Sequence, residues 1–381
     1  MTETKIGIVG GGQLAGLLAE EVVRLGGHLY SLDPDPECPA AKMGAIHVKG
    51  DRHSEADIRA LADLVEVITV DLEDVNVDAL AKLSEDGIPV IPDPKTLAQL
   101  TNKLYQKEVF RANNLPTSPF TPYDGESADG LASQGWPAVQ KAAEGGYDGR
   151  GVAIIKGPED AEKRLRVPGF VEAFVHGALE LSVMVARDAL GHVKTWDTTE
   201  MEFDDRGNLL AYLIAPARIP DETAAKARDL ATRAIEAFNG VGIFGVELFL
   251  TPEGELLINE IAPRTHNSGH YTIDACATSQ FRQQFNVLTG KPLEETTQHS
   301  ASVMFNLLGE EGFEGKTVVD GLDTLLETPG VHPYLYGKKS CFPLRKMGHV
   351  TVVANSLEEA QALADKAKSQ IVIRGDKRIK S

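Results

Sequence analysis

Cysteines and long apolar runs are scarce in this chain, and each shortage excludes a class of protein. The three cysteines, Cys38, Cys276 and Cys341, are scattered without a CxxC pair. We therefore expect neither a disulfide framework nor a zinc site, and a reducing cytosol is the natural compartment. No stretch approaches the roughly 20 apolar residues that a membrane-spanning helix needs. The first apolar run is short and leads straight into glycines, unlike a signal peptide. We expect a cytoplasmic protein with no membrane partner.

Positive charge is also in short supply. Lys and Arg number 38 against 56 Asp and Glu, which gives a formal net charge of −18. A nucleic-acid surface needs basic side chains to neutralise phosphates, so we expect no nucleic-acid partner. A local basic pocket for a phosphorylated metabolite stays compatible with this balance. At 381 residues the chain is too long for one ordinary core, and two or three domains are expected.

Strand and helix patterns alternate through the first hundred residues. Short apolar runs at residues 5–9, 28–32, 45–48, 67–70 and 89–91 read as strands, and helical patterns cover 13–25, 55–64 and 77–86. This alternation predicts an α/β domain with a parallel, doubly wound sheet. Pro92-Asp93-Pro94 then interrupts the pattern, so we place the first domain at residues 1–94.

The remainder of the chain divides once more. It contains a helical pattern at 97–113, strands at 136–142, 152–155 and 170–174, a pair of antiparallel strands at 179–186 and 193–203, and helices at 223–238 and 278–288. Gly290-Lys291-Pro292 makes a second break. Short strands and a final helix at 357–369 follow it. We predict a central domain at 95–291 and a small β-rich domain at 292–381.

The segment 243–262 reads as a β-hairpin around Pro252-Glu253-Gly254. Glu247 and Glu260 lie equally far from the centre of this turn, so they can face each other across the ladder. Opposed like charges are destabilising, and burial would raise at least one pKa. A divalent cation such as Mg²⁺ removes the conflict, since it favours carboxylate and phosphate oxygens. The alternative is a solvated hairpin whose two carboxylates face water.

A first glycine cluster, Gly10-Gly11-Gly12-Gln13-Leu14-Ala15, follows a strand and opens a helix. It satisfies GxGxxG/A, and Asp33 stands about twenty residues further on, as in dinucleotide-binding folds. One interpretation is therefore an NAD-dependent oxidoreductase. Backbone amides at a helix N-terminus would hold any phosphate equally well. A third possibility is a purely structural turn, and the motif alone leaves all of them open.

A second glycine cluster, at residues 145–151, lies between two strands and reads as a flap. It differs from a Walker A loop, which leads into a helix and ends in GK[ST]. Lys141 precedes the flap on an apolar strand and could neutralise nucleotide phosphates. Glu180 begins a later strand and could accept ribose hydroxyls. Two alternatives involve no nucleotide. The glycine cluster could be only a flexible turn, and the aliphatic part of Lys141 could simply cover an edge strand.

The order of these motifs resembles the ATP-grasp family, and most closely its N5-carboxyaminoimidazole ribonucleotide synthetases. The resemblance runs over almost the whole chain, from GGGQLAG through GGYDGRG, ELSVMVAR, GVELFL, NEIAPRTHNSGH and TSQF to RKMGHVTV. It implies three domains: the N-terminal parallel sheet, a central ATP-grasp of two α+β subdomains with a flap-bearing lid at about 115–175, and the C-terminal β-rich domain. It also implies a homodimer.

The resemblance further implies a reaction and its residues. ATP and bicarbonate would carboxylate 5-aminoimidazole ribonucleotide to N5-carboxyaminoimidazole ribonucleotide through carboxyphosphate, in purine biosynthesis. ATP would contact Lys103, Lys141, Gly146, Tyr147, Asp148, Gly149, Arg150, Gly151, Glu172, Ala173, Phe174, Val175, Glu180, Asn259 and Glu260. Glu247 and Glu260 would bind Mg²⁺, which Mn²⁺ could replace. The ribotide would contact Gly12, Gln13, Leu14, Glu73, Tyr147, Lys338 and Arg345. Arg264 and Asp148 would be catalytic, Arg264 sharing the strand face of Glu260 by period two.

The sequence departs from the family pattern at several positions. Ala262 replaces an Asn that many ATP-grasp enzymes use as a metal ligand, and Phe203 replaces a His near the nucleotide. Lys103 stands where Arg is frequent, and Asp71 and Asp74 replace Glu and Asn on either side of Glu73. Another ATP-grasp ligase, such as a formate-dependent ribotide transformylase, stays open as an alternative. The basic segment YGKKSCFPLRK could equally be an ordinary solvated surface.

Overall fold

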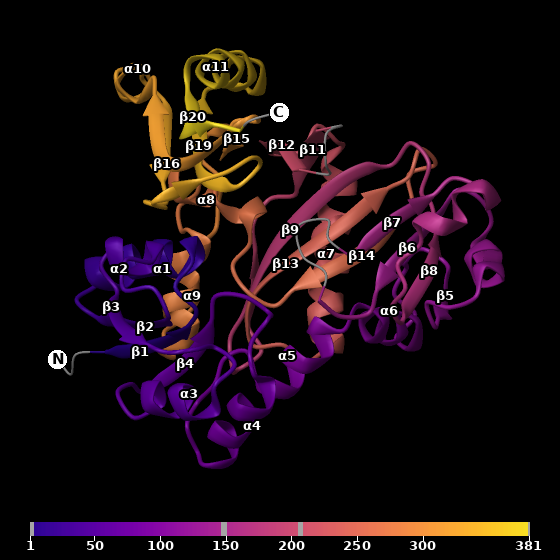
Figure 1. The fold of residues 1–381 in the computed structure, drawn as a ribbon, viewed down its shortest axis with the longest axis horizontal. Helices are drawn as coiled ribbons and strands as arrows, with labels where there is room; N and C mark the ends of the chain where they lie inside the picture. Colours follow the sequence, from indigo (N-terminus) through magenta and orange to yellow (C-terminus); the bar gives the residue numbers. More distant parts are fainter. Residues whose placement is uncertain (1–3, 146–150, 205–208, 380–381) are drawn as a thin grey trace.

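The computed structural model describes residues 4–145, 151–204 and 209–379, except for the side chain of residue 129. Figure 1 shows an N-terminal region, a central region that extends furthest along the long axis, and a C-terminal region. Five of the predicted ATP contacts, Gly146, Tyr147, Asp148, Gly149 and Arg150, lie outside the described residues.

The N-terminal region is the predicted parallel, doubly wound sheet. Its strands are β1 (Lys5–Val9), β2 (His28–Asp33), β3 (Ile46–Lys49) and β4 (Val67–Val70), in the order β3-β2-β1-β4, with helices α1 (Gln13–Arg24), α2 (Pro39–Lys42), α3 (Glu55–Ala62) and α4 (Val77–Glu85). The predicted strand at 89–91 is wrong, because only an isolated bridge joins Val90 to Ile68. Pro89 and Pro92 have no N–H to donate, so the ladder cannot extend from Val90.

The helix predicted over 97–113 is in fact two helices, α5 (Pro94–Thr101) and α6 (Lys103–Ala112). Asn102 separates them, because its side chain accepts a hydrogen bond from the backbone N–H of Tyr105. This is the usual N-cap geometry, which starts a new helix at the following residue. As a result, Lys103 and Lys107 lie one turn apart on the same side of α6.

A small antiparallel sheet in the order β5-β8-β6-β7 carries the base of the glycine flap. Its strands are β5 (Phe120–Tyr123), β6 (Ala138–Ala142), β7 (Val152–Ile155) and β8 (Gly169–Ala173), and the short 3-10 helices η1 (Ala128–Gln134) and η2 (Pro158–Lys163) accompany them. Tyr123, Leu131 and Val171 form a core on one face. Lys141 and Glu172 point to the other face. The backbone N–H of Ala142 donates to Gly151, which closes the flap at its base.

A larger sheet of nine described strands runs through the central and C-terminal regions in the order β14-β13-β9-β11-β12-β15-β19-β17, with β10 beside β9. The strands are β9 (Leu179–Arg187), β10 (Val193–Thr195), β11 (Thr199–Asp204), β12 (Leu209–Ala215), β13 (Gly242–Leu250), β14 (Leu256–Ala262), β15 (Ala301–Leu308), β17 (Val331–Leu335) and β19 (Lys346–Ala354). The strand predicted at 193–203 is interrupted at Trp196, whose buried indole N–H donates to the Thr278 carbonyl.

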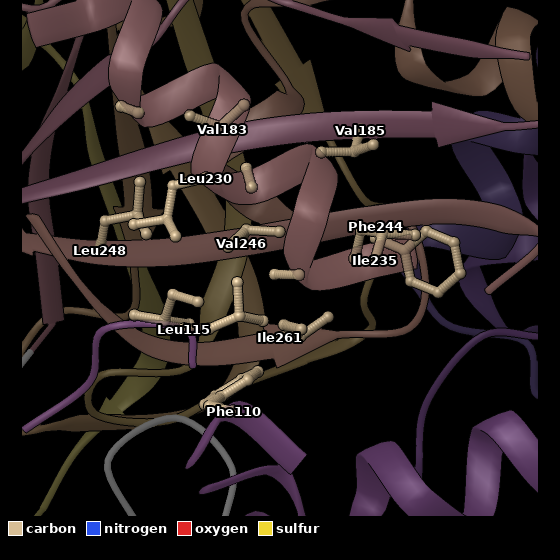
Figure 2. Close-up of a cluster of buried hydrophobic side chains, with 14 of the residues drawn as sticks. Phe110, Leu115, Val183, Val185, Leu230, Ile235, Phe244, Val246, Leu248 and Ile261 are labelled. Carbon is tan, nitrogen blue, oxygen red and sulfur yellow. The ribbon is translucent and has the colours of Figure 1, made fainter. Parts of the chain in front are cut away.

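Helix α7 (Asp221–Ala237) covers one face of β9, β13 and β14. Figure 2 shows the core between them, where Leu230 and Ile235 of α7 meet Val183 and Val246 of the strands. Side chains alternate between the two faces of a strand. Because this face is apolar, the polar residues of the same strands, including Glu180 and Glu247, lie on the opposite face.

The C-terminal region adds a second sheet and two helices. It comprises β16 (Phe313–Asp320), β18 (Ser340–Cys341), β20 (Val372–Arg378), α10 (Leu322–Leu326) and α11 (Leu357–Gln370). The preceding segment contains η3 (Asn267–Gly269), α8 (Thr272–Ala275) and α9 (Gln280–Leu288). Helix α9 packs against α1 in the N-terminal region, through Phe281 and Phe285 (Figure 1). Among the described residues, no helix is long and apolar enough to span a bilayer.

Candidate active site

Glu247 and Glu260 are opposite each other across the hairpin, as the sequence predicts. The register that produces this pairing is different from the predicted one. Next to the turn, Leu248 opposes Ile258, and a β-bulge between these pairs leaves Asn259 as the extra residue. Without the bulge, Glu247 would face Asn259 instead of Glu260. The bulge therefore aligns the two carboxylates and adds an amide side chain beside them.

The two carboxylates have opposite electrostatic surroundings. Burial raises the pKa of Glu247, and the neighbouring Glu260 and Glu180 raise it further. Burial would also raise the pKa of Glu260, but Lys103 and Lys141 outweigh it and lower the value. Lys103 forms an ion pair with Glu260. One carboxylate is thus held charged by lysines, while the other is held toward its protonated form.

A buried chain of charges lies beside this pair. The Lys141 Nζ is 2.7 Å from the Glu172 Oε1, and the Lys107 Nζ is 2.8 Å from the Glu172 Oε2. Lys141 also donates a 2.6 Å hydrogen bond to the Asn259 side chain. Lys107 was not predicted as a site residue, although its spacing of four from Lys103 on one helix was a usable signal. Strands of both sheets and helix α6 meet at this charge cluster.

Glu180 begins β9 on the same face as Glu247. It is opposite Phe249 of β13 and Met201 of β11. Burial raises the pKa of Glu180 to about 7. Of the other predicted ATP contacts, Ala173 ends β8, and Phe174 and Val175 follow it on the way to β9; all three residues are half-buried. Phe203 is on β11 and packs against the apolar cluster around Met201.

Arg264 connects the hairpin to the N-terminal region. Its Nη2 is 3.0 Å from the Glu73 Oε1. Strand β14 ends at Ala262, so the prediction that Arg264 shares the strand face of Glu260 is wrong. The chain bends at Pro263 before it reaches Arg264. That bend turns the guanidinium toward Glu73, which brings a predicted catalytic residue and a predicted substrate residue into contact.

The first glycine loop is closed by carboxylates of the chain itself. Asp71 accepts hydrogen bonds of 2.8 Å and 2.7 Å from the backbone N–H groups of Gly12 and Ala15, and Asp33 accepts one of 3.1 Å from Gly11. A Cβ at position 12 would lie 2.4 Å from the Asp71 Oδ2. The close approach of these carboxylates therefore explains, on structural grounds alone, why glycines stand in this loop. Substrate binding by Gly12, Gln13 and Leu14 stays a prediction.

The segment after the hairpin contains side chains that the prediction missed. The His266 ring shares a 2.8 Å hydrogen bond with the Ser268 hydroxyl, and its Nε2 is 3.7 Å from the Glu247 Oε1. The buried Gln280 donates to the His266 carbonyl and accepts from the His266 N–H. Its amide also contacts the His270 ring at 3.1 Å. Ser268 and His270 belong to the motif NSGH, His266 directly precedes it, and Gln280 belongs to TSQF. The motifs therefore contain these residues, but the sequence does not show the hydrogen bonds between them.

The basic C-terminal segment packs against the N-terminal region. The Lys42 Nζ of α2 donates a 2.6 Å hydrogen bond to the Gly337 carbonyl, and Lys339 pairs with Glu37. Lys338 donates to the Lys346 carbonyl at 2.8 Å, and Arg345 donates to the Ser340 carbonyl at 2.6 Å. The segment is thus an organised contact between two regions, and not only a solvated surface.

Three family models match successive parts of the chain. They are the ribonucleotide synthetase preATP-grasp domain over residues 3–100, the ATP-grasp domain over 108–281 and the phosphoribosylaminoimidazole carboxylase C-terminal domain over 302–363. The N5-carboxyaminoimidazole ribonucleotide synthetase of Thermotoga maritima superimposes with a TM-score of 0.90 at 40% identity, over 98% of this chain and 100% of that one. The chain belongs to the N5-carboxyaminoimidazole ribonucleotide synthetase family.

Two further members of this family bear on the site. The N5-carboxyaminoimidazole synthase of Aspergillus clavatus, in complex with ADP and 5-aminoimidazole ribonucleotide, aligns with a TM-score of 0.88 at 29% identity over 96% of this chain and 98% of that one. A phosphoribosylaminoimidazole carboxylase of Candida albicans is 38% identical over 95% of this chain. This chain spans only 66% of that longer protein.

Proposed function

We propose that the chain carboxylates 5-aminoimidazole ribonucleotide at the expense of ATP and bicarbonate. A bicarbonate oxygen attacks the γ-phosphorus and ADP leaves, which gives carboxyphosphate. The exocyclic amine of the ribotide then attacks the carboxyl carbon, releasing phosphate and a proton and forming N5-carboxyaminoimidazole ribonucleotide. The observation that carries the proposal is the meeting of Glu73 and Arg264, which joins the proposed ribotide region to the hairpin.

The charge cluster suits the phosphates of ATP. Lys103 pairs with Glu260, and Lys141 lies beside it through Asn259, so both can neutralise charge that develops during phosphoryl transfer. The flap, whose base at Gly145 and Gly151 is described, would cover the nucleotide and keep water from a labile intermediate. We assign the ribose hydroxyls to Glu180, and its position on the same sheet face as Glu247 supports this.

The donor set fits Mg²⁺, with Mn²⁺ as a substitute. Glu247 and Glu260 are opposed carboxylates; burial and the neighbouring Glu260 raise the pKa of Glu247, and a bound cation would favour its charged form instead. Within the described residues, no group of three or more His, Cys, Asp or Glu side chains is arranged for a metal. Two carboxylates with substrate phosphates are the coordination that Mg²⁺ ordinarily accepts, and the ion would supply charge neutralisation there.

The ribotide would lie between Glu73 and the basic C-terminal segment. Lys338→Ala should raise the KM for 5-aminoimidazole ribonucleotide about tenfold and leave the KM for ATP within about twofold, because we assign Lys338 to the phosphate ester of the ribotide and not to the nucleotide. Steady-state kinetics with each substrate varied in turn would test this. Lys366→Ala on the exposed face of α11 is the matched control. An unchanged ribotide KM would contradict the assignment.

The reaction itself is tested by coupled ADP release with each substrate omitted in turn. We expect ADP release to require both bicarbonate and 5-aminoimidazole ribonucleotide. We also propose that the protein is a homodimer, which light scattering would measure. Release supported by formate in place of bicarbonate would favour a transformylase of the same superfamily. Binding of NADH without binding of ATP would overturn the proposal altogether.

A further inference from the structure

Lys107 is among the most deeply buried charged residues of the site. Its side chain is 1% exposed, against 8% for Lys141. Three oxygens surround the Lys107 Nζ: it forms an ion pair with the Glu172 Oε2 at 2.8 Å, and it donates hydrogen bonds to the Thr117 hydroxyl at 2.6 Å and to the Ile258 carbonyl at 3.4 Å. All of these partners lie inside the protein and the side chain is buried, so Lys107 is not placed to contact a ligand itself.

Glu172 would cancel the charge that Lys141 offers to a phosphate. The two side chains are an ion pair with a nitrogen–oxygen distance of 2.7 Å, and Glu172 is 3% exposed. A buried carboxylate this close neutralises a lysine more effectively than it would in water. With Lys107 on its other oxygen, the three groups together carry one net positive charge. Lys141, as the outermost member, presents that charge toward Asn259 and the paired carboxylates.

We infer that Lys107 is a positioning residue of the nucleotide site, which holds Glu172 so that Lys141 retains a net positive charge for the phosphates of ATP. The inference rests on the nucleotide site proposed above and adds a residue to it. It also explains why a helix carries two lysines four residues apart: Lys103 serves Glu260 directly, and Lys107 serves Lys141 through Glu172.

The alternative is a purely structural role. Lys107 connects α6 to Ile258 of β14 and to Glu172 of β8, so its loss would weaken three elements whether or not ATP binds. The two roles differ in their dependence on Glu172. A structural crosslink affects the melting temperature, whereas charge balance affects nucleotide affinity only while the Glu172 carboxylate is present.

The experiment is a double-mutant cycle on Lys107 and Glu172, read by calorimetric titration with Mg-ADP and by thermal melting. Lys107→Met should weaken Mg-ADP binding about tenfold or more in the wild-type background. In the Glu172→Gln background the same change should cost less than about threefold, because no buried negative charge is left to balance. An equal loss in both backgrounds, or a lower melting temperature with unchanged affinity, would overturn the inference.

Two further variants keep the test decisive. Lys107→Gln retains a hydrogen-bonding side chain while it removes the charge, so it should reproduce the affinity loss if Lys107→Met does not fold. Lys226→Met removes an exposed lysine on α7 that pairs with the exposed Glu222, and it should leave Mg-ADP affinity unchanged. Mg-ADP binding requires neither bicarbonate nor ribotide. A failure here is therefore distinguishable from a failure of the proposed carboxylation, which the ADP-release assay reports.

Discussion

At the scale of single residues, two chemically identical side chains play different roles because their neighbours differ. Glu260 is paired with Lys103 and its pKa is lowered. Glu247 is opposed to Glu260 and its pKa is raised. Replacing each glutamate by glutamine should therefore change the stability of the ligand-free protein in opposite directions. Both replacements should slow the reaction.

Glu247→Gln should leave the melting temperature of the ligand-free protein unchanged or higher at pH 8, because it removes an unfavourable buried charge. Glu260→Gln should lower stability by about 1–3 kcal/mol, because Lys103 loses its partner. Both should reduce Mg-ATP turnover about 100-fold or more. Thermal melting and ADP release measure the two effects. Glu253→Gln in the exposed turn is the control, and equal melting shifts for Glu247 and Glu260 would contradict the assignment.

The sequence predicted this pair but not its mechanism. Symmetry about the turn indicated that Glu247 and Glu260 are opposed, and they are. The β-bulge at Asn259 that aligns them leaves no sequence signal, since it depends on how β14 fits against β13 and on the contact from Lys141. Lys107 was missed because its spacing from Lys103 places it on one side of the helix but does not show that Glu172 of a distant strand lies against it.

At the scale of elements, the segment from Arg264 to His270 has little regular structure and depends on one buried side chain. Gln280, at the start of α9, bonds both backbone polar groups of His266 and the ring of His270. A Cβ at position 269 would lie 2.6 Å from the Gln280 side chain, so the glycine lets the loop close against it. The helix that packs on α1 thus also orders a loop of the site.

Gln280→Leu should reduce turnover about tenfold and lower stability by about 1–3 kcal/mol, because buried backbone groups of His266 lose their partners. Mg-ADP affinity should change less than about twofold, since the lysines stand on other elements. Steady-state kinetics and calorimetric titration measure these quantities. Gln361→Leu on α11 is the matched control. A large loss of Mg-ADP affinity would show that the loop and the nucleotide site are not separable.

Element boundaries show where sequence patterns stop being informative. Alternation correctly predicted the N-terminal parallel sheet, because buried strands and amphipathic helices have different periods. It failed over 97–113, where apolar spacing continues across the break and only the capping side chain of Asn102 divides the helices. It also failed at Trp196, where a tertiary hydrogen bond interrupts a strand-like run.

At the scale of the whole molecule, a buried aromatic cluster joins the C-terminal region to the loop after the hairpin. The rings of His349 and Tyr334 stack with centroids 4.5 Å apart, and the His270 ring lies 4.6 Å from His349. The Tyr336 hydroxyl shares a 2.9 Å hydrogen bond with the His349 Nδ1. Burial lowers the pKa of His349 to about 3.

Because the pKa of His349 is lower in the folded than in the unfolded state, stability is retained above pH 6.5 and declines as the pH falls toward 3. This one group accounts for about 2 kcal/mol lost by pH 5. His349→Phe should flatten the decline between pH 6.5 and 5 in denaturant titrations. His299→Phe, at an exposed histidine, should not. Parallel declines in wild type and His349→Phe would contradict the role of His349.

The domain limits drawn from the sequence, at 94 and 291, remain predictions. They do not take into account that the large sheet continues from the central region into the C-terminal region. Strand β12 pairs with β15 through Ile214 and Val303, so the ladder continues past residue 291 without interruption. Nothing in the Gly290-Lys291-Pro292 break indicates this continuity, because strand pairing between distant segments has no local signature.

The continuous ladder also decides how the chain tolerates shortening. Removing everything after residue 291 would strip β15 from β12 and leave Leu213, Ile214 and Ala215 on a bare, apolar sheet edge. Exposed edges of this kind recruit strands from other molecules. A fragment ending at the apparent domain limit would therefore aggregate, although it retains every described residue of the nucleotide site.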